Sequence, residues 1–299
     1  MNFPTNFKTF IFQTESVVDK VPIEIFVAIK TKHQTPKNID PDGKPGYKND
    51  VAAIYVHPYP PLGGNFCNNV VTRLSNELAK NSTDIGIHLL VNTRGAGNSG
   101  GKTSWTGENE VHDISGILGG LDKGMIPIYG NQTGSNIKAA GLDIIENENQ
   151  NYLDLKELGI NRVLLIGYSF GAMVISGIDT FGFGFDVSMV LISYPYSVMW
   201  ALSLFNSKKY LKNIEQTLSR IQKAYGNKEF RRVLMVSGSK DNFTSIETYK
   251  EWWNEMQSTI VDNEHKDILT TRIIPDVDHF YFGKEILVFE CVYSWLNGL

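Results

Sequence analysis

The chain has little of several features that mark specialised protein classes. Two cysteines, Cys67 and Cys291, occur in 299 residues, so no disulfide framework is expected and free thiols in a reducing compartment are the default. No apolar stretch approaches the length of a membrane span, and residues 1–20 lack an apolar signal core. We therefore expect a cytoplasmic protein with no integral membrane segment, in which peripheral contact with a lipid surface stays open.

The chain also has no excess of basic residues over acidic ones. The net charge is −4 and the sequence pI is near 5.9, which argues against a nucleic-acid partner. Hydrophobic content of 42% and charged content of 20% are ordinary for a globular protein. We expect a single domain over residues 1–299, with an insertion at about 122–151, where the composition shifts toward Gly, Asn and Gln. Nothing in the chain indicates its oligomeric state.

Strand and helix patterns alternate along most of the chain. Residues 7–13 and 21–30 predict an antiparallel hairpin at a sheet edge. Apolar runs predict strands at 51–57, 85–92, 162–166, 187–193, 233–236 and 268–274. Apolar spacing predicts helices at 65–80, 108–121, 153–158, 210–225, 246–256 and 285–296, with loops at 31–49 and 57–64. The alternation predicts an α/β fold, with a mostly parallel central sheet and helices on both faces.

The pattern Gly-x-Ser-x-Gly lies between a buried strand and an apolar helix, at Gly167-Tyr168-Ser169-Phe170-Gly171. A serine there occupies a sharp, strained turn that exposes its hydroxyl, and the following helix N-terminus offers free N–H groups. A short pattern also arises by chance. Ser169 is therefore a candidate nucleophile, and this prediction depends on finding a base and an acid for it elsewhere in the chain.

A histidine is the usual base for a serine hydroxyl. The partners of such an elbow follow in the order serine, acid, histidine. That order removes four histidines from consideration: His33, His57, His88 and His112. His279 follows a predicted strand and is favoured over His265, which lies in a charged segment.

The acid is expected in a loop after a strand, between the serine and the histidine. Asp241 follows the strand at 233–236 and could orient His279. It could instead cap the next helix, in which case Glu247 or Asp276 would take its role. Two N–H groups would be needed to hold an oxyanion. One is expected from Phe170, and the other from Tyr59 in the proline-rich loop after the strand at 51–57.

Four motifs together resemble one subgroup of a known superfamily. They are His57-Pro-Tyr-Pro-Pro-Leu-Gly-Gly64, Arg94-Gly-Ala-Gly-Asn-Ser-Gly100, Gly167-Tyr-Ser-Phe-Gly-Ala172 and Asp278-His-Phe280. The chain from 51 to 295 is similar to the dienelactone-hydrolase-like subgroup of the α/β-hydrolases. The resemblance implies Ser169, Asp241 and His279 as a catalytic triad, and Tyr59 with Phe170 as oxyanion donors. It departs from the pattern at 122–151 and in a lid-like segment at about 194–228.

The sequence thus predicts a lipase-like serine esterase that cleaves carboxylic esters through an acyl-enzyme and needs no cofactor. Small-molecule or lipid esters are the expected substrates. Four residues of the apolar segment after the strand at 187–193 are predicted to line an acyl pocket, with plain core packing as the alternative: Tyr196, Met199, Trp200 and Phe205. Thioesterase or peptidase activity would use the same triad.

Three other functions are weighed against this prediction. The run Gly95-Ala-Gly-Asn-Ser-Gly100 matches a dinucleotide fingerprint, but no helix is predicted to open directly after it. A metal site built from Asp276, Asp278 and His279, with His265 and Asp267, matches no closed ligand set. The fold could also serve as a catalytically silent binding module.

Overall fold

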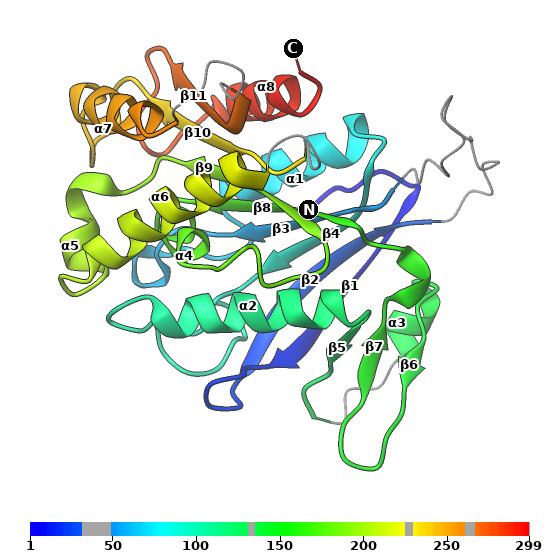
Figure 1. Ribbon diagram of the computed structural model, residues 1–299. Coiled ribbons are helices and arrows are strands. Elements are labelled where there is room, and N and C mark those ends of the chain that lie inside the picture. The colour runs from blue at the N-terminus through cyan, green and yellow to red at the C-terminus, as the bar shows by residue number, and fades with distance from the viewer. Residues whose placement is uncertain (32–48, 131–134, 225–229, 261–266, 299) are drawn as a thin grey trace.

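An eight-stranded sheet forms the centre of the computed structural model, which describes residues 1–31, 49–130, 135–224, 230–260 and 267–298. The strand order is β1-β2-β4-β3-β8-β9-β10-β11 (Figure 1). The strands are β1 Phe7–Glu15, β2 Pro22–Lys30, β3 Val51–Val56, β4 Ile85–Val91, β8 Arg162–Tyr168, β9 Asp186–Ile192, β10 Val233–Gly238 and β11 Leu269–Ile274.

Strands β4, β3, β8, β9, β10 and β11 pair in parallel, whereas β2 pairs antiparallel with both β1 and β4. The predicted α/β fold, with a mostly parallel sheet and an antiparallel N-terminal hairpin, is therefore confirmed. All six parallel strands end at the same edge of the sheet. In such sheets this edge is where ligands usually bind.

Helices cover both faces of the sheet, because the side chains of its central strands alternate between two apolar layers. Along β3, Ala52 and Ile54 belong to one layer, and Ala53 and Tyr55 to the other. The first layer includes residues of α2 Glu108–Asp122, α4 Phe170–Ser176, α6 Ser207–Ala224 and α7 Ile246–Ser258. The second includes residues of α1 Asn69–Asn81 and α8 Glu285–Leu296, which lie together in Figure 1. Within the described residues, no helix has the length and apolarity that crossing a membrane requires.

Three local predictions are corrected by backbone chemistry. The helix predicted from residue 65 begins at Asn69, because the Asn68 side chain accepts hydrogen bonds from the amides of the first turn. The helix predicted at 153–158 is wrong in its first part, since Tyr152–Asp154 is strand β7. The loop at 57–64 contains one 3-10 turn, Pro60–Leu62, whose first prolines need no N–H partner. Most of the loop predicted at 31–49 lies outside the described residues.

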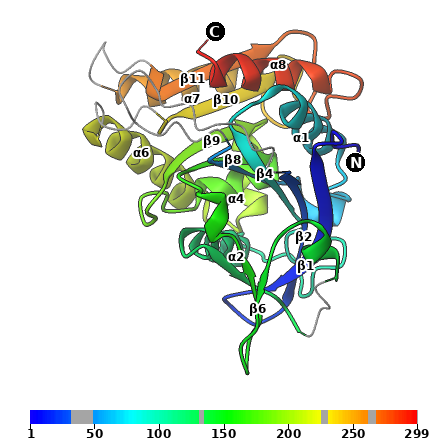
Figure 2. The same cartoon turned by 90° about the vertical axis from the view of Figure 1, so that its right-hand side faces the viewer.

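The region predicted as an insertion carries a small second sheet. Strands β5 Met125–Pro127 and β6 Ile144–Ile145 pair antiparallel with β7, and the short helix α3 Ser135–Ala139 lies between β5 and β6. Figures 1 and 2 show this sheet at one end of the molecule, next to β1. Ile126 and Ile128 are buried in the main apolar layer, and the Tyr129 amide donates to the Gln13 carbonyl of β1. The division of the chain into one domain with an insertion stays a prediction.

A buried arginine ties the loop after β4 to two other elements. Arg94 is 2% exposed and pairs with Asp113 of α2 at 2.9 Å and with Asp19 of the β1–β2 turn at 3.0 Å. Its Nη2 also donates to the Ser16 hydroxyl. Burial raises the pKa of the Asp113 carboxyl, although the Arg94 guanidinium favours the charged form. The arginine of the Arg-Gly-x-Gly-x-Ser turn therefore has a structural explanation.

The glycine-rich turn after β4 is held by a second buried carboxylate. Glu24 of β2 accepts hydrogen bonds from the Asn92 amide side chain at 2.7 Å and from the Asn98 backbone at 3.0 Å. A side chain at Gly97 would collide with the Asn92 amide. Helix α2 opens eight residues after Gly100. This geometry differs from that of a dinucleotide site, where the glycine turn runs directly into a helix.

We predict that Arg94→Met destabilises the protein by about 3–5 kcal/mol, because it leaves the Asp113 carboxylate buried without its cation. The measurement is the free energy of unfolding in urea. Arg220→Met is the matched control, since Arg220 pairs with Asp179 in the open at 2.7 Å and should cost less than about 1 kcal/mol. Equal losses in the two variants would contradict the role given to Arg94.

Candidate active site

Ser169 occupies a strained turn between β8 and α4. Its backbone has φ 55° and ψ −117°, a conformation that is rare for a residue with a side chain. A Cβ at Gly167 would lie 2.4 Å from the Gly171 carbonyl oxygen, and one at Gly171 would lie 2.1 Å from the Val56 carbonyl oxygen of β3. Both glycines of Gly-x-Ser-x-Gly are therefore required by close backbone contacts. The Ser169 amide donates to Ile192 at the end of β9, which anchors the turn.

The structure brings Ser169, His279 and Asp241 together in one hydrogen-bonded chain. His279 Nε2 lies 2.9 Å from Ser169 Oγ, and His279 Nδ1 lies 2.8 Å from Asp241 Oδ2. All three side chains are buried or nearly so, with Ser169 9% exposed. Asp241 follows β10 and His279 follows β11, so both reach the serine from the carboxyl edge of the sheet. Such a chain can move a proton from the hydroxyl to the imidazole.

Asp241 is held as a carboxylate by several donors. Burial alone would raise its pKa, but the hydrogen bond and charge of His279 and the Phe243 amide hold that pKa below its usual value. Its Oδ1 accepts from the amides of Phe243 and Thr244 at 2.9 and 3.2 Å. The helix-cap alternative does not apply, because Ser245 caps α7. The His279 ring nitrogens bond to Asp241 and Ser169, and not to the two other candidate acids, Glu247 and Asp276.

Three neighbours that the sequence patterns did not single out fix His279. The Tyr168 hydroxyl donates to the His279 carbonyl at 2.6 Å, and the Asn242 side chain accepts from the His279 amide at 3.3 Å. The Phe243 ring meets the imidazole edge-on at 4.5 Å between centroids. Burial raises the pKa of the Tyr168 phenol, so it stays protonated and donates. Their positions in the sequence could have pointed to them, since each lies within two residues of Ser169 or Asp241.

Tyr59 and Phe170 lie next to each other beside the serine. Their rings are 5.2 Å apart between centroids, and Tyr59 lines the same cavity as Ser169. Phe170 is the first residue of α4, where a backbone N–H has no partner within the helix. Within the described part of the chain, neither amide donates a hydrogen bond. Two N–H groups are therefore available for a ligand oxygen.

The histidine of the proline-rich loop is structural. His57 is fully buried, and burial lowers its pKa to about 4, so the ring is neutral. Its Nδ1–H donates to the Pro58 carbonyl at 2.6 Å, because a carbonyl only accepts, and its Nε2 accepts from the Thr93 amide at 3.0 Å. The loop then folds back on itself, as the Gly64 amide donates to the Tyr59 carbonyl. These bonds hold the backbone at Tyr59.

A cavity of about 340 Å³ opens at Ser169 and His279. Its walls come from the loop after β3, the start of α1, the segment after β9 and the loops after β10 and β11. The lining residues include no Asp, Glu, Lys or Arg. The apolar side chains among them include Leu62, Val198, Leu202, Phe243, Phe280 and Phe282. The cavity suits an uncharged, largely apolar group next to the serine hydroxyl.

None of the four residues predicted to line an acyl pocket lies among the lining residues of this cavity: Tyr196, Met199, Trp200 and Phe205. Met199 is buried in the core, and Tyr196 packs on Trp252 at 4.8 Å between ring centroids. Trp200 and Phe205 face solvent. The same segment does reach the cavity, but through Val198 and Leu202. Residues 225–228 of the predicted lid-like segment lie outside the described residues.

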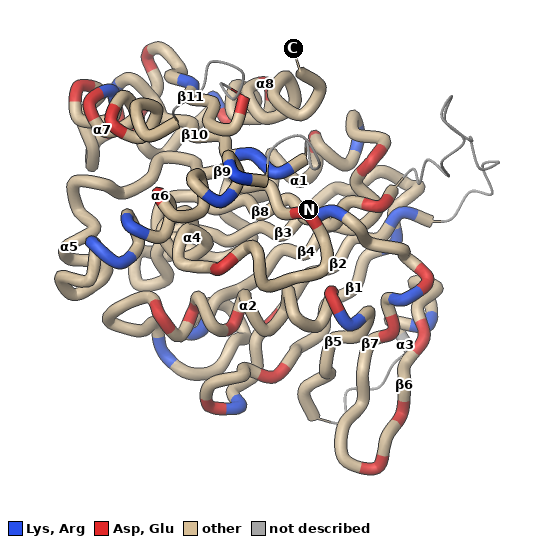
Figure 3. The backbone as a smooth tube through the Cα atoms, in the orientation of Figure 1, with Lys and Arg blue, Asp and Glu red and all other residues tan. Residues whose placement is uncertain are grey.

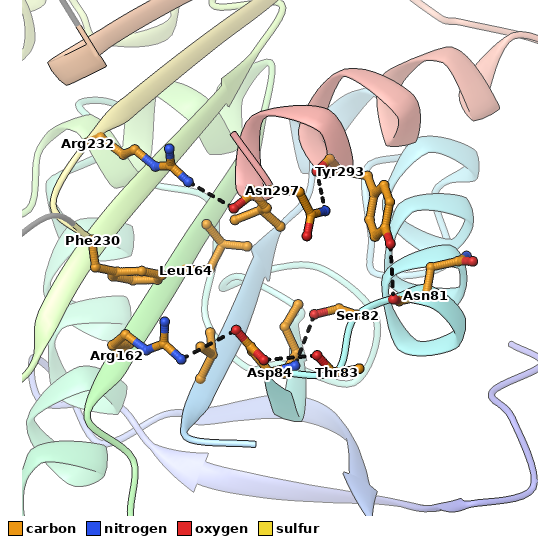
Figure 4. Close-up of a pocket in the computed structure, with 13 residues that line it drawn as sticks. Asn81, Ser82, Thr83, Asp84, Arg162, Leu164, Phe230, Arg232, Tyr293 and Asn297 are labelled. Carbon is orange, nitrogen blue, oxygen red and sulfur yellow. Dashed lines mark hydrogen bonds and ion pairs between the residues drawn. The ribbon is translucent and has the colours of Figure 1, made fainter. Parts of the chain in front are cut away.

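A second hollow of about 350 Å³ lies at the amino ends of β3, β4 and β8, the edge of the sheet opposite to Ser169 (Figure 4). Figure 4 shows Arg162 and Arg232 on one side of it and Ser82 and Thr83 on the other. Arg162 pairs with Asp50, and Arg232 donates to the last turn of α8. No histidine or cysteine is among its described lining residues, so it lacks the groups for acyl transfer.

No group of three or more His, Cys, Asp or Glu side chains in the described ranges is placed to hold a metal ion. Two of the residues predicted as alternative metal ligands have other partners. Asp276 pairs with Lys240 at 2.8 Å, and His279 is hydrogen-bonded to Ser169. His265 lies outside the described residues.

Comparison by sequence finds no matching family model and no matching curated protein. Comparison by structure finds many α/β hydrolases. XC6422 of Xanthomonas campestris, an α/β serine hydrolase without a lid, is 17% identical over 99% of this chain and 96% of its own, with a TM-score of 0.57. The Pyrococcus furiosus esterase Pf2001 is 16% identical over 97% and 92%, with a TM-score of 0.55. Est1E of Butyrivibrio proteoclasticus is 10% identical over 97% and 98%, also with a TM-score of 0.55. The chain therefore has the α/β-hydrolase fold.

Proposed function

We propose that this protein is a serine hydrolase that cleaves carboxylic esters through an acyl-enzyme. The observation that carries the proposal is the chain of hydrogen bonds from Ser169 through His279 to Asp241, located at an uncharged cavity. The order of serine, acid and histidine along the sequence predicts the same three residues. The names of two similar proteins, an α/β serine hydrolase and an esterase, add support at the level of the fold.

In the first half of the reaction, the ester carbonyl would bind with its oxygen at the amides of Tyr59 and Phe170. His279 Nε2, 2.9 Å from Ser169 Oγ, would take the hydroxyl proton as the oxygen attacks the carbonyl carbon. The Asp241 carboxylate accepts the Nδ1–H, which keeps Nε2 free as the base and then stabilises the imidazolium. The two amides stabilise the charge that develops on the carbonyl oxygen.

Collapse of the tetrahedral intermediate would break the ester C–O bond. The imidazolium of His279 gives its proton to the leaving alkoxide, and the acyl group remains on Ser169 Oγ. In the second half, water takes the place of the alcohol and loses a proton to His279. The resulting hydroxide attacks the acyl carbon, and the proton returns to Ser169 as the carboxylic acid leaves. No step requires a redox or metal group.

The cavity favours an uncharged acyl substrate. Its described lining has no Asp, Glu, Lys or Arg, so a charged group next to the scissile bond would be desolvated without a partner. Thioester or amide cleavage would use the same triad and remains the alternative activity. A catalytically silent binding module is disfavoured, because the strain at Ser169 and the buried Asp241–His279 pair have no use in binding alone.

Ser169→Ala is predicted to lower turnover of p-nitrophenyl acetate at least a thousandfold, on the order seen when a serine nucleophile is removed. The wild-type protein should also bind one fluorophosphonate covalently, at Ser169, as located by mass spectrometry of the labelled peptide. Ser197→Ala is the matched control, since Ser197 is exposed on the segment next to the cavity and its loss should change neither result. Labelling of another residue, or full turnover without Ser169, would refute the proposal.

Leu202→Trp is predicted to shift preference toward short acyl or alcohol chains, because the larger ring fills the cavity that Leu202 lines. The ratio of kcat/KM for hexanoate over acetate p-nitrophenyl esters should fall about tenfold, as expected for one or two methylene groups that lose their contact. Ala201→Trp adds the same ring at the neighbouring exposed position of helix α5 Met199–Leu202 and should leave the ratio unchanged. A ratio unaffected by Leu202→Trp would count against this cavity as the binding pocket for the acyl or alcohol chain of the substrate.

Tyr168→Phe tests the positioning of the base, because it removes the 2.6 Å hydrogen bond to the His279 carbonyl. We expect kcat for p-nitrophenyl acetate to fall about two- to tenfold, the range for one neutral hydrogen bond, while KM changes little. Tyr194→Phe removes a comparable buried hydrogen bond, to Ser176 at 3.0 Å. It should affect the free energy of unfolding but not kcat. A rise in KM with unchanged kcat would mean that Tyr168 acts on the substrate and not on His279.

A further inference from the structure

We infer that the mouth of the Ser169 cavity docks on the surface of a neutral lipid aggregate and takes its ester from there. This inference rests on the proposed esterase function and adds the physical form of the substrate. A group of exposed apolar side chains at the carboxyl edge of the sheet, called the apolar rim below, supports it. The rim consists of Leu62, Trp105, Trp200, Leu204, Phe205, Phe280 and Phe282.

The rim gathers at one edge of the sheet because of the parallel topology. Leu62 follows β3, Trp105 follows β4, residues 200–205 follow β9, and residues 280–282 follow β11. All four strands are parallel, so these loops emerge at the carboxyl edge, where Ser169 also lies. Leu62, Phe280 and Phe282 line the cavity mouth itself. Trp105 adjoins the Tyr59 loop in a neighbouring hollow.

The rim side chains are too exposed to be part of the core. Leu62 is 80% exposed, Trp105 79%, Phe205 74% and Phe282 73%. Seven large apolar residues face water at one edge of the sheet, which is more than the scattered single exposures that are normal for a protein surface. An apolar partner would therefore gain by covering them.

The backbone near α5 Met199–Leu202 carries strain that serves this exposure. Leu204 and Phe205 have φ 44° and 67°, an uncommon conformation for bulky residues without a glycine's freedom. The Phe205 amide donates to the Trp200 carbonyl, which closes the turn. The Trp200 and Phe205 rings contact each other at 5.9 Å between centroids, and both remain exposed. Burial of these side chains within the protein does not offset the cost of the strained backbone, which points to a contact with something outside the protein.

A lipid surface fits the rim better than a protein partner does. Leu62, Phe280 and Phe282 of the rim line the cavity itself, so a protein seated on the rim would cover the entry to Ser169, whereas an ester aggregate would supply that entry with substrate. Two lysines near the rim are paired with carboxylates: Lys240 with Asp276, and Lys209 with Glu108. Figure 3 shows acidic residues beside basic ones over most of the molecule. Attraction to anionic head groups is therefore not needed, and a neutral surface is sufficient.

The test is co-sedimentation of the wild-type protein with phosphatidylcholine vesicles at low and high salt. We expect binding that salt does not weaken, as for apolar contact. Trp252, Trp253 and Trp295 are buried, so a blue shift of tryptophan emission on vesicle addition reports Trp105 and Trp200. Trp200→Ser with Phe205→Ser should lower the partition coefficient about tenfold or more. Neither residue lines the cavity, so turnover of p-nitrophenyl acetate should stay unchanged.

The matched control is Ile11→Ser with Val17→Ser, which removes two exposed apolar side chains of β1 and the turn that follows it. This variant should bind vesicles like the wild type. Absence of wild-type binding, or an equal loss in both double variants, would overturn the inference. So would a dimer of the wild type that Trp200→Ser with Phe205→Ser dissolves, because the rim would then belong to a second copy of the chain.

The two proposals fail in different measurements. If fluorophosphonate labels Ser169 and p-nitrophenyl acetate is hydrolysed, but vesicles are not bound, only the docking inference is wrong. If vesicles are bound through the rim but Ser169 is not labelled, the esterase proposal is wrong and the docking of a neutral lipid surface stands without its substrate role.

Discussion

The structure around Ser169 depends on the close crossing of α4 over the ends of β3 and β8. Helix α4 approaches these strands so closely that a Cβ at Gly171 would overlap the Val56 carbonyl, and one at Gly167 would overlap Gly171. That approach leaves no room for a relaxed turn, so Ser169 takes a strained backbone conformation. The same crossing leaves the Phe170 amide at the start of a helix without a partner in it. Nucleophile and first oxyanion donor thus follow from one packing constraint.

A second close contact joins the loops that deliver the acid and the histidine. A Cβ at Gly238, the last residue of β10, would lie 2.2 Å from the Val277 carbonyl oxygen. The loop before His279 therefore runs directly over the end of β10, which brings the imidazole within 2.8 Å of Asp241. Tyr168, from the elbow, then donates to the His279 carbonyl. The ends of three strands, β8, β10 and β11, are linked in this way, and their relative positions fix the proton path.

Sequence patterns sufficed where the backbone alone decides the structure. Strands buried on both faces give continuous apolar runs, and glycines mark the close contacts, so the sheet and the order of Ser169, Asp241 and His279 could be read from the chain. The cavity lining could not. Tyr196, Met199, Val198 and Leu202 are all apolar neighbours in a segment of two single turns, and which of them faces the cavity depends on how Tyr196 packs on Trp252. The start of α1 depends on the Asn68 side-chain cap, and strand β7 depends on its pairing with β5 and β6.

The loops at the carboxyl edge of the sheet have to meet two opposite requirements. The proton path has to be dry and rigid, which the buried Asp241 and His279 satisfy, because hydrogen bonds between charged groups gain strength away from water. The entrance has to be open to an apolar substrate, and Phe280 follows His279 directly while remaining partly exposed. Consecutive residues of one loop therefore point inward to the triad and outward to the rim. Since parallel strands bring every such loop to one edge, the topology that assembles the triad also assembles the apolar rim around it.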